Sequence, residues 1–250
     1  MSQSEVLLRG RQITRRWGGL VALDRVSLEL ERGQVHALIG TNGAGKSTLI
    51  NILSGEVPAS QGQVELLGQD VTAWSQPRRA RAGLGRSYQR DTIFPGFTVF
   101  ENCRLAAQAR VQKPWAWWQA AQRCQASSAA AQAAAIRVGL ADLLELQAGL
   151  LSHGHKRQLE IAMCLATQPE VLLLDEPLAG MGAEETERML ALLAELRTGH
   201  AILLVEHDMD AVFRIADCIT VMVNGAVIAS GTPAFVRNNA DVQATYLGEN

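Results

Sequence analysis

The sequence contains no long apolar run and almost no excess of charge. None of its hydrophobic stretches approaches the ~18 to 20 residues that a membrane-spanning helix needs, so we expect no such span. The 23 basic and 25 acidic residues leave a formal net charge of -2, which gives the chain as a whole no attraction for polyanions. Binding to nucleic acid would therefore require a local basic patch.

Cysteine is also scarce, and the opening residues lack the pattern of a secretory leader. The four cysteines are scattered without the spacing of a metal site or a disulfide framework: Cys103, Cys124, Cys164 and Cys218. Residues 1–5 carry neither the basic flank nor the apolar stretch of a secretory signal. These absences favour a reducing cytoplasm, and we interpret the cysteines as small buried hydrophobic residues.

What the sequence does contain is the apolar content of one sizeable globular core, with 48% hydrophobic residues in 250. Four nearly continuous apolar runs are typical of parallel strands covered on both faces: 35–39, 171–174, 201–205 and 219–223. Amphipathic spacing predicts helices at 46–53, 156–167 and 183–196, and looser alternation predicts half-exposed antiparallel strands at 21–30 and 64–67. The predicted fold class is therefore α/β, with a mostly parallel sheet and an amino-terminal antiparallel β layer.

The middle of the chain differs in composition from the rest. Ala-rich stretches such as 126–135 and the lack of a convincing strand predict an inserted α-helical subdomain over residues 95–167. Residues 1–94 and 168–235 then form the α/β core, and residues 236–250 a carboxyl-terminal tail. A cluster of Trp115, Trp117 and Trp118 within the insertion fits either a contact surface for a partner or lipid headgroups, or the packing of a helical hairpin.

The strongest motif is a phosphate-binding loop. Residues 40–47 fit the pattern G-x-x-x-x-G-K-[ST] and lie between a predicted strand and a predicted helix, the context that this motif requires. Its glycines let backbone N–H groups point at phosphate oxygens, and the following helix presents its positive end to the same anion. We expect Lys46 to serve the β- and γ-phosphates and Ser47 to bind Mg²⁺. The expected ATP-binding residues here are Gly40, Thr41, Asn42, Gly43, Ala44, Gly45, Lys46, Ser47 and Thr48.

A second motif places two carboxylates at the end of a buried strand. The run 171–174 leads directly into Asp175 and Glu176, at the edge where open α/β sheets bind ligands. We expect Asp175 to hold Mg²⁺, directly or through water, and Glu176 to orient or deprotonate the water that attacks the γ-phosphate. Alone, two such acids would also fit a solvated strand end, but the phosphate loop favours the catalytic interpretation.

A third motif precedes the predicted helix 156–167. Residues 151–155 read Leu-Ser-His-Gly-His and resemble the signature Leu-Ser-Gly-Gly-Gln of the ABC ATPases, whose motif order this chain also shares. The resemblance implies a P-loop NTPase core, ATP hydrolysis, and two such domains packed head to tail. Ser152, Gly154 and His155 would then close over ATP held by the other subunit, at a helix start whose dipole favours the γ-phosphate.

The same resemblance implies roles for three more residues. Trp17 matches the aromatic residue that stacks on adenine, Gln89 the loop glutamine that senses magnesium and the attacking water, and His207 the switch histidine. The expected catalytic residues are thus Glu176, His207 and Gln89, and the expected metal ligands are Ser47, Gln89 and Asp175. The chain departs from the family where His153 and His155 replace Gly and Gln, and where Gly182 replaces a frequent aspartate, which bears on communication between subunits.

Five arginines surround Gln89 in the sequence: Arg78, Arg79, Arg81, Arg86 and Arg90. This basic run fits a solvated face, and it also fits a contact with a permease or, less well, with nucleic acid. The pattern alone does not distinguish these interpretations.

Several local phrases are similar to those of the cytoplasmic ATPases of branched-chain amino acid importers and their urea-importing relatives: 16–20, 94–95 with 98–102, 159–162, 178–181, 205–209 and 246–249. The kinship implies a second ABC ATPase subunit as a homo- or heterodimer partner, two transmembrane permease subunits and, indirectly, a periplasmic solute-binding protein. It also implies a position in the cytoplasm, peripheral on the inner membrane, and no nucleic acid. A soluble ABC ATPase acting on DNA or ribosomes is the alternative, but its usual fused cassettes, coiled-coil insertion and basic stretches are not seen. A partner subunit with little turnover is disfavoured because Lys46, Asp175, Glu176 and His207 are all present.

Overall fold

A parallel sheet forms the centre of the molecule. The structure, a computed structural model, describes residues 5–89, 92–111 and 124–244. Its six-stranded sheet has the order β10-β9-β3-β8-β7-β6, in which only β10 pairs antiparallel to its neighbour. The strands are β3 Val35–Gly40, β6 Leu84–Arg86, β7 Val171–Asp175, β8 Ala201–Val205, β9 Cys218–Val223 and β10 Ala226–Gly231. The four apolar runs are therefore confirmed as neighbouring strands, and β3, β7 and β8 are buried along their whole length.

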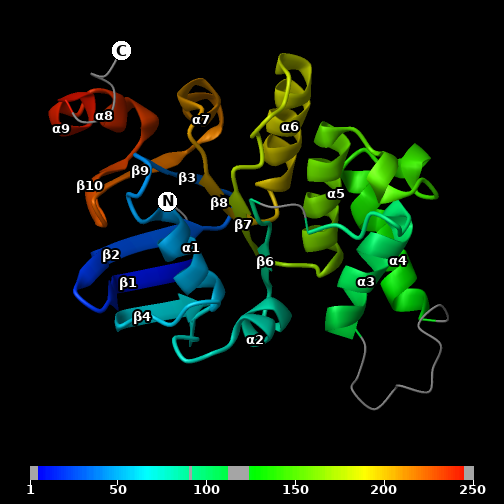
Figure 1. Cartoon of the computed structure of the whole chain (residues 1–250), viewed down its shortest axis with the longest axis horizontal. Helices are drawn as coiled ribbons and strands as arrows, with labels where there is room; N and C mark the ends of the chain where they lie inside the picture. Colours follow the sequence, from blue (N-terminus) through cyan, green and yellow to red (C-terminus); the bar gives the residue numbers. More distant parts are fainter. Residues whose placement is uncertain (1–4, 90–91, 112–123, 245–250) are drawn as a thin grey trace.

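A second, antiparallel sheet, formed by the amino-terminal part of the chain, lies beside helix α1 (Lys46–Ser54) and the parallel sheet (Figure 1). Its order is β2-β1-β4-β5, with β1 Val6–Trp17, β2 Leu20–Glu31, β4 Gln61–Leu66 and β5 Gln69–Asp70. The sequence pattern predicted β2 and part of β4 but not β1. The reason is that the pairing of β1 with β2 shifts register at several points, and each shift interrupts the period-two alternation from which a strand is predicted.

Helices cover the parallel sheet and build a separate lobe at one side (Figure 1). In that lobe α3, Val99–Val111, α4, Gln125–Arg137, and α5, His153–Ala166, all contact one another. The other helices are α1 Lys46–Ser54, α2 Gln76–Arg81, α6 Ala183–Leu196, α7 Met209–Ile215, α8 Pro233–Arg237 and α9 Ala240–Val242, with 3-10 turns at Ala141–Leu143 and Ala148–Leu150. In the described part of the chain, no helix has the length and apolar character to cross a membrane.

Small residues let the helices of this lobe pack closely. Ala131, Ala134 and Ala135 of α4 are buried against the cluster that α3 and α5 supply, which explains the Ala-rich stretch seen in the sequence.

The tryptophan cluster 115–118 lies outside the described residues. In the same lobe Cys103 and Cys164 are buried, and burial raises the pKa of each thiol to about 12, which keeps them protonated.

Two hydrophobic clusters cover the two opposite faces of the parallel sheet. One joins the sheet to the helical lobe and to α6, and the other fills the space between the sheet, α1 and the antiparallel layer. Alternating residues of one strand enter each cluster: Leu172 and Leu174 face the lobe, while Val171 and Leu173 face α1. This arrangement holds the carboxyl ends of β3 and β7 in fixed positions, and both phosphate-loop and carboxylate motifs follow those ends.

Candidate nucleotide-binding site

The loop between β3 and α1 has a backbone that only glycine can adopt at its two ends. Gly40 has a φ of 152°, and a Cβ there would lie 2.1 Å from the carbonyl oxygen of Met222. Gly45 has a φ of 98° and caps the start of α1, where a Cβ would lie 2.8 Å from the carbonyl oxygen of Ala22. The loop is therefore pressed against its neighbours, and the first N–H groups of α1 are directed at its concave side.

Lys46 folds back over this loop. Its Nζ donates to the carbonyls of Gly40 at 2.7 Å and Thr41 at 3.1 Å. Burial lowers the pKa of Lys46, while the negative charges of Glu176 and Asp175 act in the opposite direction. The ammonium group thus contacts two carbonyl oxygens and lies in the field of two carboxylates. Phosphate oxygens would form stronger, charge-assisted hydrogen bonds with it in place of the carbonyls.

A pocket of about 590 Å³ opens over the loop. It is lined by Trp17, Leu20, Val21, Ala22, Asn42, Gly43, Ala44, Gly45, Lys46, Ser47, Thr48, Gln89, Glu176, Asn224 and Gly225. Most predicted residues of the phosphate loop thus share one cavity with Trp17, Gln89 and Glu176. Gly40, Thr41 and Asp175 are not among the lining residues, and the size suits a nucleotide.

The two carboxylates at the end of β7 have different environments. Asp175 is 7% exposed, and burial raises the pKa of its carboxyl while the charge of Arg86 opposes that rise. Glu176 leaves the strand with a φ of 51°, a left-handed conformation that is uncommon for a residue with a side chain. Its backbone N–H donates to the carbonyl of Val205 at 2.9 Å, which holds this turn against β8. Strain of this kind is frequent at functional sites.

Gln89 and Glu176 are in contact, whereas His207 stands apart. The Nε2 of Gln89 donates to Oε2 of Glu176 at 2.9 Å. His207 has a side chain that is 64% exposed, with Nδ1 3.8 Å from Oε2 of Glu206, and it does not line the pocket. The buried Glu206 accepts from the N–H groups of Leu178 and His207, and burial raises the pKa of its carboxyl. Single-chain geometry thus groups Gln89 with Glu176 and leaves His207 at the strand end.

The Trp17 ring lines the pocket and is packed against an arginine. The guanidinium carbon of Arg15 lies 3.7 Å from the Trp17 ring centroid, and the Nη1 of Arg15 donates to the carbonyl of Pro58 at 2.9 Å. Trp17 itself is 50% exposed. Such a ring offers the flat apolar surface that a nucleobase needs for stacking.

The signature residues line a second pocket of about 290 Å³ that shares no residue with the first. Ser152 caps α5 by accepting from the N–H of His155 at 3.2 Å, and Ser152, Gly154 and His155 line this pocket. The Nε2–H of His153 donates to the carbonyl of Ala179 at 3.0 Å. The substituted histidine thus ties the signature to the loop after β7.

Sequence reasoning missed part of the nucleotide pocket. Val21, Ala22, Asn224 and Gly225 line it without belonging to any motif described above, and Leu20 lines it as the last residue of the phrase 16–20. Gly225 supports the phosphate loop directly, since its N–H donates to the carbonyl of Ala44 at 3.0 Å. The available signal was the Asn-Gly pair after a strand, which is typical of a two-residue hairpin turn, and both residues indeed have positive φ. Leu20 to Ala22 gave no such signal.

The basic run is not uniformly a solvated face. Arg79 is 2% exposed and donates to the carbonyls of Ile52 and Leu53, the last turn of α1. Arg86 donates to Asn51 Oδ1 and to Ser54 Oγ at the same helix end. These two arginines therefore hold the carboxyl end of the phosphate-loop helix. A positive charge at this end is also favourable because it compensates the negative end of the helix dipole. The interpretation of the run as one solvated face is wrong for both residues.

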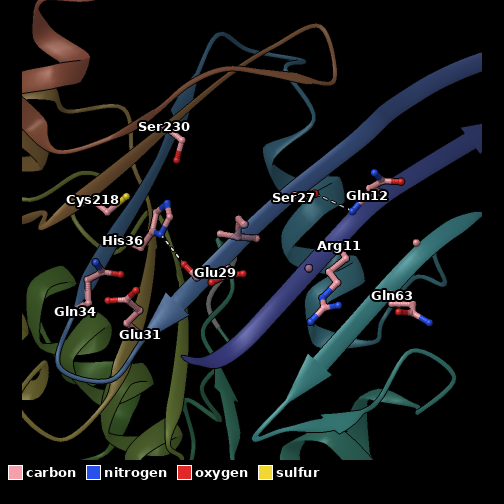
Figure 2. A pocket seen from close by; sticks show the side chains of 13 residues that line it. Arg11, Gln12, Ser27, Glu29, Glu31, Gln34, His36, Gln63, Cys218 and Ser230 are labelled. Carbon is pink, nitrogen blue, oxygen red and sulfur yellow. Dashed lines mark hydrogen bonds between the residues drawn. The ribbon is translucent and has the colours of Figure 1, made fainter. Parts of the chain in front are cut away.

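A larger hollow of about 820 Å³ lies elsewhere, at the junction of the two sheets (Figure 2). His36, which is 3% exposed, stands in its wall, with Nδ1 3.0 Å from the carbonyl of Glu29 and Nε2 2.7 Å from Oγ1 of Thr220. Burial lowers the pKa of His36. The hollow shares no residue with the phosphate-loop pocket, so its size does not mark it as the site of ATP chemistry.

A strand, a glycine-rich loop with its lysine, and a helix, with paired carboxylates at the next strand end, define a nucleotide-binding domain of the P-loop NTPase class. The chain belongs to the ABC transporter family, whose ATP-binding domain matches residues 23–179. Residues 226–250 match a second family, the branched-chain amino acid ATP-binding cassette transporters. The chain is therefore an ATP-binding, ATP-hydrolysing subunit of an ABC transporter.

Similar proteins cover nearly the whole chain. The high-affinity branched-chain amino acid transport ATP-binding protein LivG of Salmonella typhimurium is 41% identical over 98% of this chain and 99% of its own length. The corresponding BraF of Pseudomonas aeruginosa is 38% identical over 98% and 99%. The crystal structure of the ADP conformation of MJ1267, an ATP-binding cassette of an ABC transporter, has a TM-score of 0.88 and 30% identity, covering 98% of this chain and 100% of that one.

Proposed function

We propose that this chain powers the import of branched-chain or related small hydrophobic amino acids by hydrolysing ATP at the inner face of a membrane. The proposal rests on the likeness to LivG and BraF along nearly the whole chain, together with a carboxyl-terminal match to the branched-chain amino acid cassettes. Urea and small amides are related small solutes that the proposal also includes. The alternative, an ABC ATPase acting on DNA or ribosomes, is disfavoured. Two arginines of this chain's basic run, Arg79 and Arg86, are engaged at the end of α1 and are not presented as a basic surface for nucleic acid.

Each residue of the pocket has a proposed task. Lys46 and the N–H groups at the start of α1 bind the phosphates, and Trp17 stacks on the base. Glu176 takes a proton from the attacking water, because it is the carboxylate that lines the pocket. Gln89, held 2.9 Å from Glu176, orients that water. His207 contributes only when the pocket is closed, since its side chain lies outside the open one.

The residues near the phosphate loop also fit a magnesium ion. Ser47, Gln89 and Asp175 supply hydroxyl, amide and carboxylate oxygens, the hard donors that Mg²⁺ combines with water and phosphate oxygens. Within the described residues, no group of three or more His, Cys, Asp or Glu side chains surrounds a common point, so phosphate and water must complete any such site. The ion would supply positive charge that neutralises the phosphates.

Two cassettes are needed for one complete ATP site. The phosphate-loop pocket and the signature pocket have no residue in common, so one chain does not enclose one nucleotide between them. The signature pocket has the capped start of the 14-residue α5 in its wall, a dipole end that attracts a phosphate. We therefore assign Ser152, Gly154 and His155 to the ATP of a second ABC ATPase subunit. Identical or different partner chains would serve equally.

The proposed assembly also contains two permease subunits and, indirectly, a periplasmic solute-binding protein. The described residues hold no helix that could cross a membrane, so passage of the solute must be supplied by other chains. This chain would then lie on the cytoplasmic side, peripheral to the inner membrane, and would bind no nucleic acid.

The test is to recover the tagged chain from solubilised membranes of its native host. We expect two hydrophobic permeases, a second ATPase and vanadate-sensitive ATP hydrolysis in the same fraction. Binding of radiolabelled leucine, and separately of urea, to the associated solute-binding protein would identify the solute. Recovery of ribosomes or DNA-repair proteins in place of permeases would overturn the importer assignment.

A further inference from the structure

The ring of Trp17 has a position that the hydrophobic core does not support. Trp17 is the last residue of β1 and pairs with Leu20 across a two-residue turn, Gly18 and Gly19. It belongs to none of the hydrophobic clusters in the described part of the chain, and it is 50% exposed. An aromatic side chain at the tip of a hairpin has several rotamers, so another contact must fix its orientation if it is to receive a base.

Arg15 supplies such a contact from the same strand. The two residues are two positions apart in β1, which places their side chains on the same face. The guanidinium carbon of Arg15 lies 3.7 Å from the centroid of the Trp17 ring, within the range of a cation–π interaction. The Nε of Arg15 is buried and has no hydrogen-bond partner among the described residues. Hydrogen bonding alone therefore does not account for the place of this arginine.

The segment between α1 and β4 holds Arg15 in turn. The Nη1 of Arg15 donates to the carbonyl of Pro58 at 2.9 Å. The same segment is attached to β1 next to the arginine, because the N–H of Ser60 donates to the carbonyl of Thr14 at 2.8 Å. Arg15 thus connects the ring at the hairpin tip to the chain that leaves the phosphate-loop helix.

Arg15 takes no part in the lining of the nucleotide pocket. Trp17 shares that pocket with Lys46, whereas Arg15 is not among the lining residues. An arginine on the pocket side of the ring would line the cavity as well. The guanidinium therefore covers the ring on the side away from the pocket, and any effect of Arg15 on a nucleotide must pass through the ring.

We propose that Arg15 is a positioning residue for the adenine base: its guanidinium holds the Trp17 ring so that the base stacks on the opposite face. This inference rests on the proposed function, in which Trp17 is the stacking residue. A ring that is already oriented loses less conformational freedom when ATP binds, so the arginine raises ATP affinity without touching the nucleotide.

The experiment measures the binding of ATP and of inorganic tripolyphosphate, each with Mg²⁺, to the purified full chain. Tripolyphosphate has no base, so its affinity reports on the phosphate loop alone. The variants are R15A, R15K, W17A and the double variant R15A/W17A. R11A is the matched control, because Arg11 is a 53% exposed arginine of the same strand whose ion pair with Glu65 lies away from the nucleotide pocket.

We expect R15A to weaken ATP binding by about fivefold and W17A by about tenfold or more, with unchanged tripolyphosphate affinity in both. R15K keeps a cation near the ring and should lose less, and R11A should match the wild type. R15A/W17A should bind ATP no more weakly than W17A, because the arginine acts only through the ring. In the transporter complex, R15A should raise KM for ATP and leave kcat unchanged.

Three results would overturn the proposal while W17A still loses ATP affinity. The first is wild-type or increased ATP affinity in R15A, since an increase would mean that the arginine occupies the place of the base. The second is an equal loss of tripolyphosphate affinity in R15A, and the third is a pair of losses that add in R15A/W17A. Wild-type ATP affinity in W17A would instead contradict the stacking role within the proposed function.

Discussion

Glu176 combines an uncommon backbone conformation with a position in the lining of the phosphate-loop pocket. Its φ of 51° turns the chain sharply after β7, so that Asp175 stays buried while Glu176 faces the cavity. The same turn separates the tasks of two adjacent carboxylates, since one becomes a buried anion beside Arg86 and the other reaches Gln89. Two neighbouring acids in a regular strand would point to opposite faces of the sheet.

Replacing Glu176 by glutamine should therefore stop hydrolysis without removing ATP. The amide keeps the size of the side chain but does not accept the proton of the attacking water, so we expect kcat to fall by about a hundredfold or more. ATP should remain bound between two subunits, and size-exclusion chromatography with ATP should show an accumulated dimer. Lys46→Ala is the contrast, since it should lose ATP affinity itself. A Glu176→Gln variant that turns over at the wild-type rate would remove the general-base assignment.

Local motifs allowed the prediction of individual site residues, but not of their contacts. Lys46 and Ser47 were predicted from the fixed spacing of the phosphate-loop motif and Glu176 from its place at the end of a buried strand, and all three line one pocket. The bond between Gln89 and Glu176 joins residues 87 positions apart, and no sequence period reports such a distance. Arg157 and Glu160 form an ion pair at 2.7 Å with side chains that are 7% and 2% exposed, and the amphipathic spacing of a helix does not report such a buried pair.

At the level of elements, the hairpin between β9 and β10 supports the phosphate loop. Gly225 donates to the carbonyl of Ala44, and its own carbonyl accepts from the N–H of Asp24 at 2.9 Å. The hairpin thus connects the loop to β2, a strand of the other sheet. A tight turn at this place lines the same pocket as the phosphate loop, even though no motif contains it.

Gly225→Ala should consequently weaken both folding and ATP binding. The residue has a φ of 79°, and a Cβ would lie 2.7 Å from the carbonyl oxygen of Ala22, so strain and collision add. Gly68→Ala is the matched control, with a φ of 73° and open space around the Cβ. We expect urea unfolding to show a loss of about 1 kcal/mol for the control and more for Gly225→Ala, with reduced ATP affinity only in the latter. Equal ATP affinity in the two variants would argue against a supporting role for the turn.

Strands that are buried on both faces were predictable as elements, while β1 and β10 were not. A continuous apolar run such as Ala201–Val205 is a strong signal because both faces exclude water. In β1 the bulges break the alternation, and β10 is only partly buried along most of its length. Short helices such as Met209–Ile215 also escaped, since seven residues give too few turns for a period to be read.

On the scale of the whole molecule, the junction of the two sheets carries a buried histidine whose titration is linked to folding (Figure 2). Burial lowers the pKa of His36, so the unfolded chain binds a proton more readily than the folded one. Stability must then rise with pH through this window and fall as the pH drops below about 6.5, by up to about 1.4 kcal/mol per pH unit for one proton.

His36→Gln should remove this dependence. The amide provides a donor for the carbonyl of Glu29 and an acceptor for Thr220, but it does not titrate. We expect the slope of unfolding free energy against pH, measured with urea between about pH 5 and 6.5, to become flatter. The decrease in slope should correspond to at most one proton taken up on unfolding. Burial also lowers the pKa of His200, which is present in both proteins and cancels in the comparison. Parallel slopes would show that His36 is not responsible.

We predict that the proposed permease contacts this chain at the groove between the core and the helical lobe. It has a volume of about 340 Å³, and Ala80 of α2 and Ala106 and Met163 of the lobe line it together with Tyr88, Thr92 and Glu160. Tyr88 and Thr92 flank Gln89 in the chain and line the groove, whereas Gln89 itself does not. A permease segment seated there would touch the backbone that positions Gln89, which links solute passage to hydrolysis by contact.

Ala80→Glu tests this placement, because it introduces a charge into a half-apolar groove without touching the nucleotide pocket. A charge buried under a docked permease segment costs several kcal/mol, so recovery of the permeases with the tagged variant should fall by more than about tenfold. ATP affinity of the chain should stay unchanged. Ala234→Glu, on the exposed side of α8, is the control and should leave recovery at the wild-type level. If permeases still co-purify with Ala80→Glu, the docking surface lies outside this groove, and the link between solute passage and the Gln89 loop cannot be direct.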